Sequence, residues 1–113
     1  MEIKQGDVVL CEFYFTNLKA AKHRPVLVLK DNLPFNDFVA IPISSQTNKL
    51  QRDEYVITKD KFASGSIPKT SKIILRKTFV VSKDVVLKKY GSLQQIEFNK
   101  YHKLFCQYFN CCA

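Results

Sequence analysis

The sequence predicts a mainly β protein of the α+β class, a small barrel or sandwich followed by one C-terminal helix. Five short stretches rich in β-branched and aromatic residues are separated by turn-forming segments, a spacing typical of small β folds. After Ser92 the apolar residues follow a helical period instead. The length of 113 residues is common for one domain, so we expect a single unit over residues 1–113.

The first expected strand covers residues 7–15, and a polar, lysine-bearing loop follows at 16–23. Pro25 restricts the residue before it to extended geometry, so we expect Arg24 at the entrance of the second strand. Pro42 removes a backbone donor and predicts an edge or bulged position for the third strand. The second to fifth strands are expected at 26–29, 38–44, 54–58 and 71–81.

The expected helix begins near Ser92 and ends by about Asn110. Ser92 with Gln95 three residues later fits a capping box, which satisfies two free backbone donors at a helix start. An isolated helix of this length is marginal in water, so its apolar face must pack on the sheet. The residues expected on that face are Leu93, Ile96, Tyr101, Leu104, Phe105 and Tyr108.

The formal net charge of +8 and the sequence pI near 9.4 favour an anionic partner. Nucleic acid, an acidic protein segment and a membrane surface are all compatible with this charge. The basic residues are spread along the chain and form no polybasic tail, so any common site must be assembled by the fold.

No run of apolar residues has the length of a membrane span, and the N-terminus lacks the apolar stretch of a signal peptide. We therefore expect a cytoplasmic protein that does not enter a membrane. The four cysteines, at positions 11, 106, 111 and 112, lack a paired C-x-x-C spacing. In a reducing compartment they are expected to be free thiols, and we expect neither a metal nor a cofactor.

Arg24, His23 and Ser44 form the first candidate site. A guanidinium and a hydroxyl at the ends of two neighbouring strands can hold one phosphate from two sides. Each residue also has an ordinary structural interpretation: an arginine before proline is often solvated, a histidine in a lysine-rich loop often lies on the surface, and a serine that closes a strand often forms a turn. The pattern alone leaves both interpretations open.

Four segments resemble the successive signatures of the MazF/PemK toxin family: residues 6–10, 13–17, 22–29 and 41–46. The resemblance continues less distinctly through 71–73 and 91–93 to the terminal helix. It implies an SH3-like barrel, as in CcdB/PemK toxins, that forms a symmetric homodimer and cuts single-stranded RNA without a metal. It also implies an acidic, partly disordered antitoxin, and operator DNA bound through the antitoxin complex.

The resemblance also implies roles for individual residues. In the family's reaction the ribose 2′-hydroxyl attacks the adjacent phosphodiester, and by motif position Arg24 stabilises the charged phosphorane. Ser44 stands where the family has a threonine that holds the phosphate, and it keeps the hydroxyl without the methyl group that restricts the rotamer. His23 can shuttle protons near neutral pH. The residues expected to bind RNA are His23, Phe15, Lys22, Ser45, Gln46, Arg76 and Lys77.

The fifth strand departs from the family pattern. Many PemK-like members place an arginine and then an acidic residue around the positions of Ile74 and Arg76, whereas this chain has no carboxylate there. We expect an active nuclease, in which Arg24 and Ser44 suffice. The alternatives are a weakened nuclease that still binds RNA or antitoxin, and a module that binds a protein such as a topoisomerase.

Overall fold

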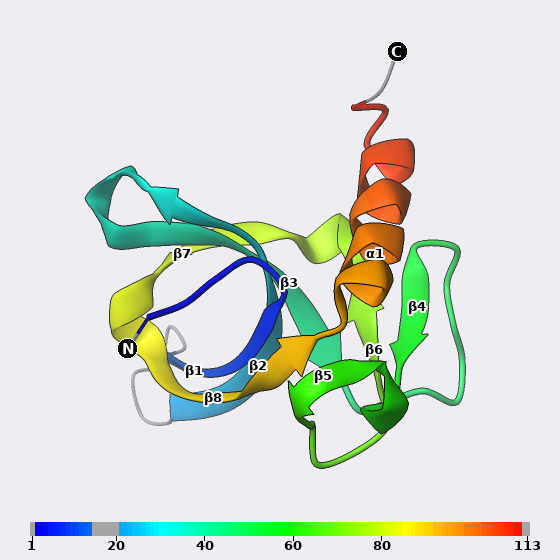
Figure 1. The fold of residues 1–113 in the computed structure, drawn as a ribbon, viewed down its shortest axis with the longest axis horizontal. Helices are drawn as coiled ribbons and strands as arrows, with labels where there is room; N and C mark the ends of the chain where they lie inside the picture. Colours follow the sequence, from blue (N-terminus) through cyan, green and yellow to red (C-terminus); the bar gives the residue numbers. More distant parts are fainter. Residues whose placement is uncertain (1, 15–20, 112–113) are drawn as a thin grey trace.

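The computed structural model describes residues 2–14 and 21–111 and contains one curled antiparallel sheet with an α-helix near the C-terminus (Figure 1). No helix within those residues is long and apolar enough to cross a membrane. The elements are β1 (Asp7–Tyr14), β2 (Ala21–Leu33), β3 (Asp37–Ser44), β4 (Glu54–Ile57), β5 (Phe62–Gly65), β6 (Ser71–Ile74), β7 (Phe79–Ser82), β8 (Val86–Leu93) and α1 (Gln95–Tyr108).

The strands follow the order β4-β6-β3-β2-β1-β8-β5, and β7 pairs with β3. One edge of β3 therefore has two partners: β7 along Asp37–Ala40 and β6 at Ile43 and Ser44. Pro42 lies between these two stretches while it pairs with Val26 of β2 on the other edge. The expectation of an edge strand is thus wrong for β3, because a proline without N–H is tolerated where the strand changes partner.

Both faces of the central strands are buried, which explains the uninterrupted apolar run Val26–Leu29. Because side chains alternate along a strand, Val26 and Val28 enter one apolar cluster and Leu27 and Leu29 enter the other. The first cluster also contains Ile3 and Phe38, and the second contains Phe98 and Tyr101 of α1.

Helix α1 lies beside β4 and is anchored there by Tyr101 (Figure 1). The Tyr101 hydroxyl donates a hydrogen bond of 2.8 Å to the carbonyl of Val56, and burial raises the pKa of this tyrosine to about 12. Phe98 is also buried against the sheet. The expected apolar face is partly wrong, because Ile96 is 64% exposed and Tyr108 is 45% exposed.

The helix begins at Gln95 and not at Ser92, so the predicted capping box is wrong. Ser92 is still in β8, and its hydroxyl donates a 2.6 Å hydrogen bond to the buried carboxylate of Asp7. That hydroxyl is therefore unavailable to cap α1. Gln94 occupies the cap position without a side-chain capping bond.

The structure interrupts the predicted strand 71–81 with a 3₁₀ turn at Leu75–Lys77, and it adds β5 and β8. These two added strands approach each other closely at the pair Gly65 and Gly91. A Cβ atom on Gly65, whose φ is +65°, would lie 2.2 Å from the Tyr90 carbonyl oxygen. Only glycine permits this approach, which fixes the start of the turn that follows β5.

Candidate active site

Arg24 and Ser44 lie on the neighbouring strands β2 and β3 and line the same groove. The β2–β3 ladder pairs Val26 with Pro42, each two residues along its strand from Arg24 and Ser44. Arg24 is exposed and Ser44 is half-buried, so both reach solvent from this position.

Arg24 does not mark the entrance of its strand, which corrects the sequence prediction. β2 begins at Ala21, because its pairing with β1 continues to the pair Tyr14 and Ala21. Arg24 itself pairs with Cys11, a fully buried residue. The guanidinium therefore extends from a backbone that is fixed by neighbouring strands, and not from a loop.

A groove of about 570 Å³ opens at these positions. Its walls come from β2, from the end of β3 and the loop after it, and from the turn after β5. Two residues of β6 and single residues of β8 and of the 3₁₀ turn after β6 complete the lining. Six of the residues expected at the site line this groove: His23, Arg24, Ser44, Ser45, Gln46 and Lys77.

Lys69 and Tyr90 also line the groove and were not expected at the site. In the sequence Lys69 directly follows Pro68 in a turn. In the structure this turn forms one wall of the groove. Tyr90 is half-buried, and the Lys88 ammonium lies 5.1 Å from the centre of its ring. No sequence signal set this tyrosine apart from the tyrosines that pack in the core.

The described residues that line the groove include the cationic side chains of Arg24, Lys69 and Lys77 and no aspartate or glutamate. Three positive charges around one depression raise the local concentration of anions. Serine hydroxyls and the Gln46 amide add neutral donors beside them. The groove is therefore suited to a phosphate ester, whose oxygens need several donors at once.

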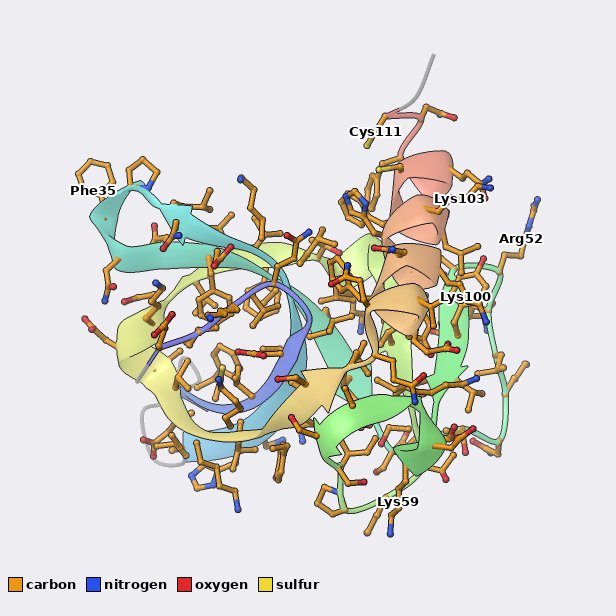
Figure 2. The ribbon with its side chains drawn as sticks, viewed as in Figure 1. Phe35, Arg52, Lys59, Lys100, Lys103 and Cys111 are labelled. Atoms are coloured by element: carbon orange, nitrogen blue, oxygen red, sulfur yellow. The ribbon has the colours of Figure 1, made fainter. Side chains whose placement is uncertain are left out.

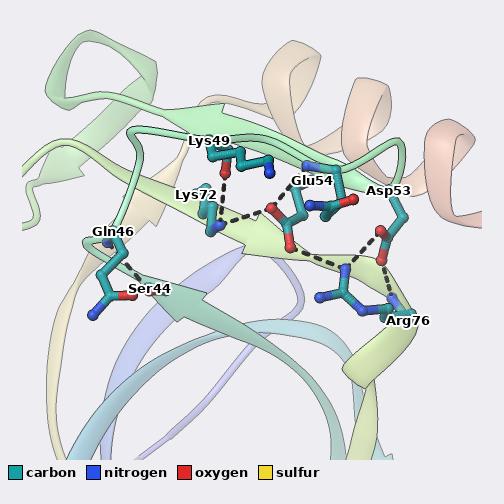
Figure 3. A network of polar contacts seen from close by, with 8 residues as sticks. Ser44, Gln46, Lys49, Asp53, Glu54, Lys72 and Arg76 are labelled. Carbon is teal, nitrogen blue, oxygen red and sulfur yellow. Dashed lines mark hydrogen bonds and ion pairs between the residues drawn. The ribbon is translucent and has the colours of Figure 1, made fainter.

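The Ser44 hydroxyl has a defined orientation. Its Oγ accepts a 3.2 Å hydrogen bond from the backbone N–H of Gln46 (Figure 3). One lone pair of Oγ is thereby occupied, and the hydroxyl hydrogen is the part of the group that can donate into the groove. This contact partly replaces the rotamer restriction that a threonine methyl would supply.

His23 lies at the edge of the groove beside a carboxylate. Its Nε2 is 3.7 Å from Glu12 Oε1 across the β1–β2 ladder, and 53% of the His23 side chain is exposed. An imidazole next to a carboxylate at the rim of an anion-binding groove can accept and return a proton.

Arg76 does not reach the groove. Its Nη1 lies 2.7 Å from Asp53 Oδ1 and 2.9 Å from Glu54 Oε2, and its backbone N–H donates to Asp53 Oδ2 at 2.8 Å (Figure 3). Hydrogen bonds to both carboxylates raise the pKa of the guanidinium. The arginine faces a different depression of about 810 Å³, between the start of β4 and the end of α1.

The two carboxylates that hold Arg76 come from the start of β4 and from the residue before it. Asp53 and Glu54 are buried, with 5% and 2% of their side chains exposed. The Lys72 ammonium, 2.7 Å away, and the Gln51 N–H lower the pKa of Glu54 to about 2, and Arg76 contributes. These carboxylates form a structural network and do not line the groove.

The other two expected RNA-binding residues stay predictions. Lys22 is exposed on β2 and is not among the residues that line the groove. Phe15 lies outside the residues that the structure describes.

The sequence matches one family model, described as PemK-like, MazF-like toxin of type II toxin-antitoxin system, over residues 4–109. The chain belongs to this family. The predicted family, and with it the predicted class of toxin, is confirmed. No protein of curated function matches this MazF-like chain in sequence.

Solved structures confirm the predicted fold class, a mainly β protein with a C-terminal helix, whose sheet is a curled antiparallel half-barrel. A mycobacterial endoribonuclease in complex with its cognate antitoxin has a TM-score of 0.73 at 16% identity, covering 99% of each chain. Another mycobacterial endoribonuclease has a TM-score of 0.69 at 16% identity, covering 96% of this chain and 91% of that chain. The Mycobacterium tuberculosis toxin MazF-mt6 has a TM-score of 0.64 at 15% identity, covering 90% of this chain and 96% of its own.

Proposed function

We propose that this MazF-like toxin is an endoribonuclease that cuts single-stranded RNA in the Arg24–Ser44 groove without a metal ion. The observation that carries the proposal is that one groove is lined by a guanidinium, that of Arg24, and by the hydroxyl of Ser44, which accepts a hydrogen bond from the Gln46 N–H. They open into one groove whose described lining residues include no acidic side chain. A protein-binding module has no need for such a phosphate site.

The reaction is an internal transfer at phosphorus. The 2′-hydroxyl oxygen forms a bond to the adjacent phosphorus, the bond from phosphorus to the 5′-oxygen breaks, and the products carry a 2′,3′-cyclic phosphate and a 5′-hydroxyl. Arg24 stabilises the added negative charge on the phosphorane, and Ser44 donates a hydrogen bond to one of its oxygens. In this proposal His23 takes the proton from the 2′-hydroxyl and Arg24 gives a proton to the leaving 5′-oxygen. His23 then releases its proton to solvent and Arg24 takes one up from solvent, which restores both side chains.

Lys77 and the Ser45–Gln46 pair hold the rest of the strand in this proposal. Lys77 neutralises a flanking phosphate, and the Gln46 amide can hydrogen-bond an unpaired base edge. The proposed partners are a second copy of the chain, a cognate acidic antitoxin, and operator DNA bound through the antitoxin complex, all in the cytoplasm. An acidic segment that folds as it binds would compete with RNA for the basic groove.

The test is cleavage of a long single-stranded RNA in the presence of a chelator. The parent should produce discrete fragments with 5′-hydroxyl ends, and Arg24→Ala should lower kcat about 100-fold or more, since removal of one such donor has effects of this size. Lys103→Ala is the matched control, because it removes a cation that projects from the exposed side of α1 (Figure 2). Cleavage by Arg24→Ala at the parental rate would refute the site.

A second candidate function is a module that binds RNA, antitoxin or a topoisomerase and does not cut. The observation that favours it is Arg76, which stands where many PemK-like members have an acidic residue and is held by Asp53 and Glu54. Binding of RNA without scission in the same assay would support this candidate. Phosphate contacts make the affinity for RNA fall steeply as salt rises, so a flat salt response would exclude RNA as the partner and favour a protein target such as a topoisomerase.

A further inference from the structure

We propose that Lys72 is a positioning residue for RNA cleavage, which acts by fixing the segment 45–50 and thereby the Ser44 hydroxyl. The inference rests on the proposed function of the groove and adds a residue that lies outside it. Lys72 is not among the residues that line the groove, so it acts through its neighbours.

Lys72 connects three parts of the chain (Figure 3). Its Nζ donates a 3.2 Å hydrogen bond to the carbonyl oxygen of Lys49 and lies 2.7 Å from Glu54 Oε1. Its own backbone pairs with Ser44 in the β3–β6 ladder. Lys72 therefore links the end of β3 through its backbone, and the loop after β3 and the start of β4 through a side chain that is 12% exposed.

Residues 45–50 contain no helix or strand and have few restraints of their own. Ser44 is held at the start of this segment by the ladder, and Lys49 is held near its end by Lys72. Between them, the Gln46 N–H donates to Ser44 Oγ, so the direction of the Ser44 hydroxyl depends on where Gln46 lies. Release of Lys49 would let Gln46 move and the hydroxyl rotate.

Glu54 makes Lys72 a firm anchor. Besides Lys72, the carboxylate accepts 3.0 Å and 2.9 Å hydrogen bonds from Gln51 N–H and Arg76, and its side chain is 2% exposed. Removing the cationic partner of a buried carboxylate is strongly unfavourable, so the Lys72 ammonium cannot leave for solvent easily. A second N–H of that ammonium donates to the Lys49 carbonyl oxygen.

The expected effect on cleavage is on kcat. A donor displaced by about 1 Å from a reacting phosphate can lower the rate up to about 100-fold, and a loosened segment spends part of its time in place. We therefore expect Lys72→Met to lower kcat roughly tenfold and to leave KM for RNA nearly unchanged. The substitution leaves Arg24 and Lys77 in the groove, and these are the residues proposed to bind the RNA.

The experiment combines Lys72→Met with Ser44→Ala in a double-mutant cycle. If Lys72 acts through Ser44, adding Lys72→Met to Ser44→Ala produces no further loss of kcat. Lys72→Arg should restore most of the activity, because its guanidinium can bond both acceptors. Asp53→Asn is the matched control: it removes a charge from the same network, but its carboxylate contacts Arg76 and not Lys72 or Lys49, so its kcat should be parental.

Amide hydrogen exchange measured by NMR tests whether Lys72 fixes the segment 45–50, and it requires no cleavage of RNA. The Gln46 amide should exchange several-fold faster in Lys72→Met than in the parent and should be unchanged in Asp53→Asn. If Lys72→Met does not fold, the double variant Lys72→Met/Glu54→Gln removes the unpaired buried charge and still releases Lys49.

Three results would overturn the inference. The first is a parental kcat in Lys72→Met. The second is a double variant Lys72→Met/Ser44→Ala whose loss of kcat equals the product of the two single losses, and the third is an unchanged exchange rate of the Gln46 amide in Lys72→Met. Failure of the proposed function is a different result, since the parent itself then leaves RNA intact. In that case the exchange measurement alone decides whether Lys72 fixes the segment.

Discussion

The buried carboxylate of Glu54 predicts a specific loss of stability in acid. Its pKa is lowered from 4.5 to about 2 in the folded protein, first by the hydrogen bond from Lys72 and then by that from the Gln51 N–H. Above pH 4.5 the group is ionised in the folded and the unfolded chain, and its full stabilisation is present. Below that pH the Glu54 carboxylate becomes protonated in the unfolded chain but stays ionised in the folded chain, so the free energy of unfolding falls.

The size of this loss follows from the two pKa values. Each pH unit between 4.5 and about 2 removes about 1.4 kcal/mol of unfolding free energy, or about 3 kcal/mol over the whole interval. The side chain is 2% exposed, so solvent screens little of this interaction. Between pH 4.5 and about 3, where the fold should still be measurable, the expected loss is about 2 kcal/mol.

Urea unfolding monitored by circular dichroism measures the free energy of unfolding of the parent and of Glu54→Gln at each pH. The variant has no carboxyl at position 54 to titrate. Acidic groups outside this network titrate in both proteins and cancel in the difference. The difference in unfolding free energy between the parent and Glu54→Gln should therefore shrink by about 2 kcal/mol from about pH 6 to about pH 3. A difference that stays constant over this range would refute the account of the network.

Two further predictions follow from the packing. Gly91→Ala places a Cβ atom 2.3 Å from the carbonyl oxygen of Ser64, so we expect it to lower the free energy of unfolding by about 3 kcal/mol or more; an unchanged thermal midpoint would mean that β5 and β8 can separate. Burial raises the pKa of the Cys11 thiol to about 11, so iodoacetamide at about pH 8 should label exposed Cys111 much faster in the folded protein. Equal labelling of the two thiols by peptide mass spectrometry would contradict the buried position of β1.

The sequence predicts the part of the site that lies in two local motifs. Arg24-Pro25 and Ser44–Gln46 each occupy consecutive positions, and the alternation of apolar residues on β2 and β3 fixes which faces are buried. Antiparallel pairing then brings the two motifs together, which is why short sequence patterns sufficed for this half of the groove.

Features that depend on distant pairings were missed or wrong. Ser92 looked like a helix cap because its best partner, Asp7, lies 85 residues away in sequence. Arg76 looked like a free RNA-binding cation because its carboxylates lie 22 and 23 residues away, on β4 or directly before it. Local secondary-structure propensity carries no information about such partners, because they come together only when distant strands pair in the folded sheet.

The central claim is that Arg24 and Ser44 hold one scissile phosphate between them. The most direct measurement is a crystal structure of the toxin with a single-stranded RNA made uncleavable by a 2′-deoxy substitution at its mapped cleavage position. We predict that the Arg24 guanidinium and Ser44 Oγ both lie within hydrogen-bond distance of oxygens of the phosphate that follows that position. A complex in which that phosphate contacts neither side chain, or lies in the Arg76 depression, would contradict the claim.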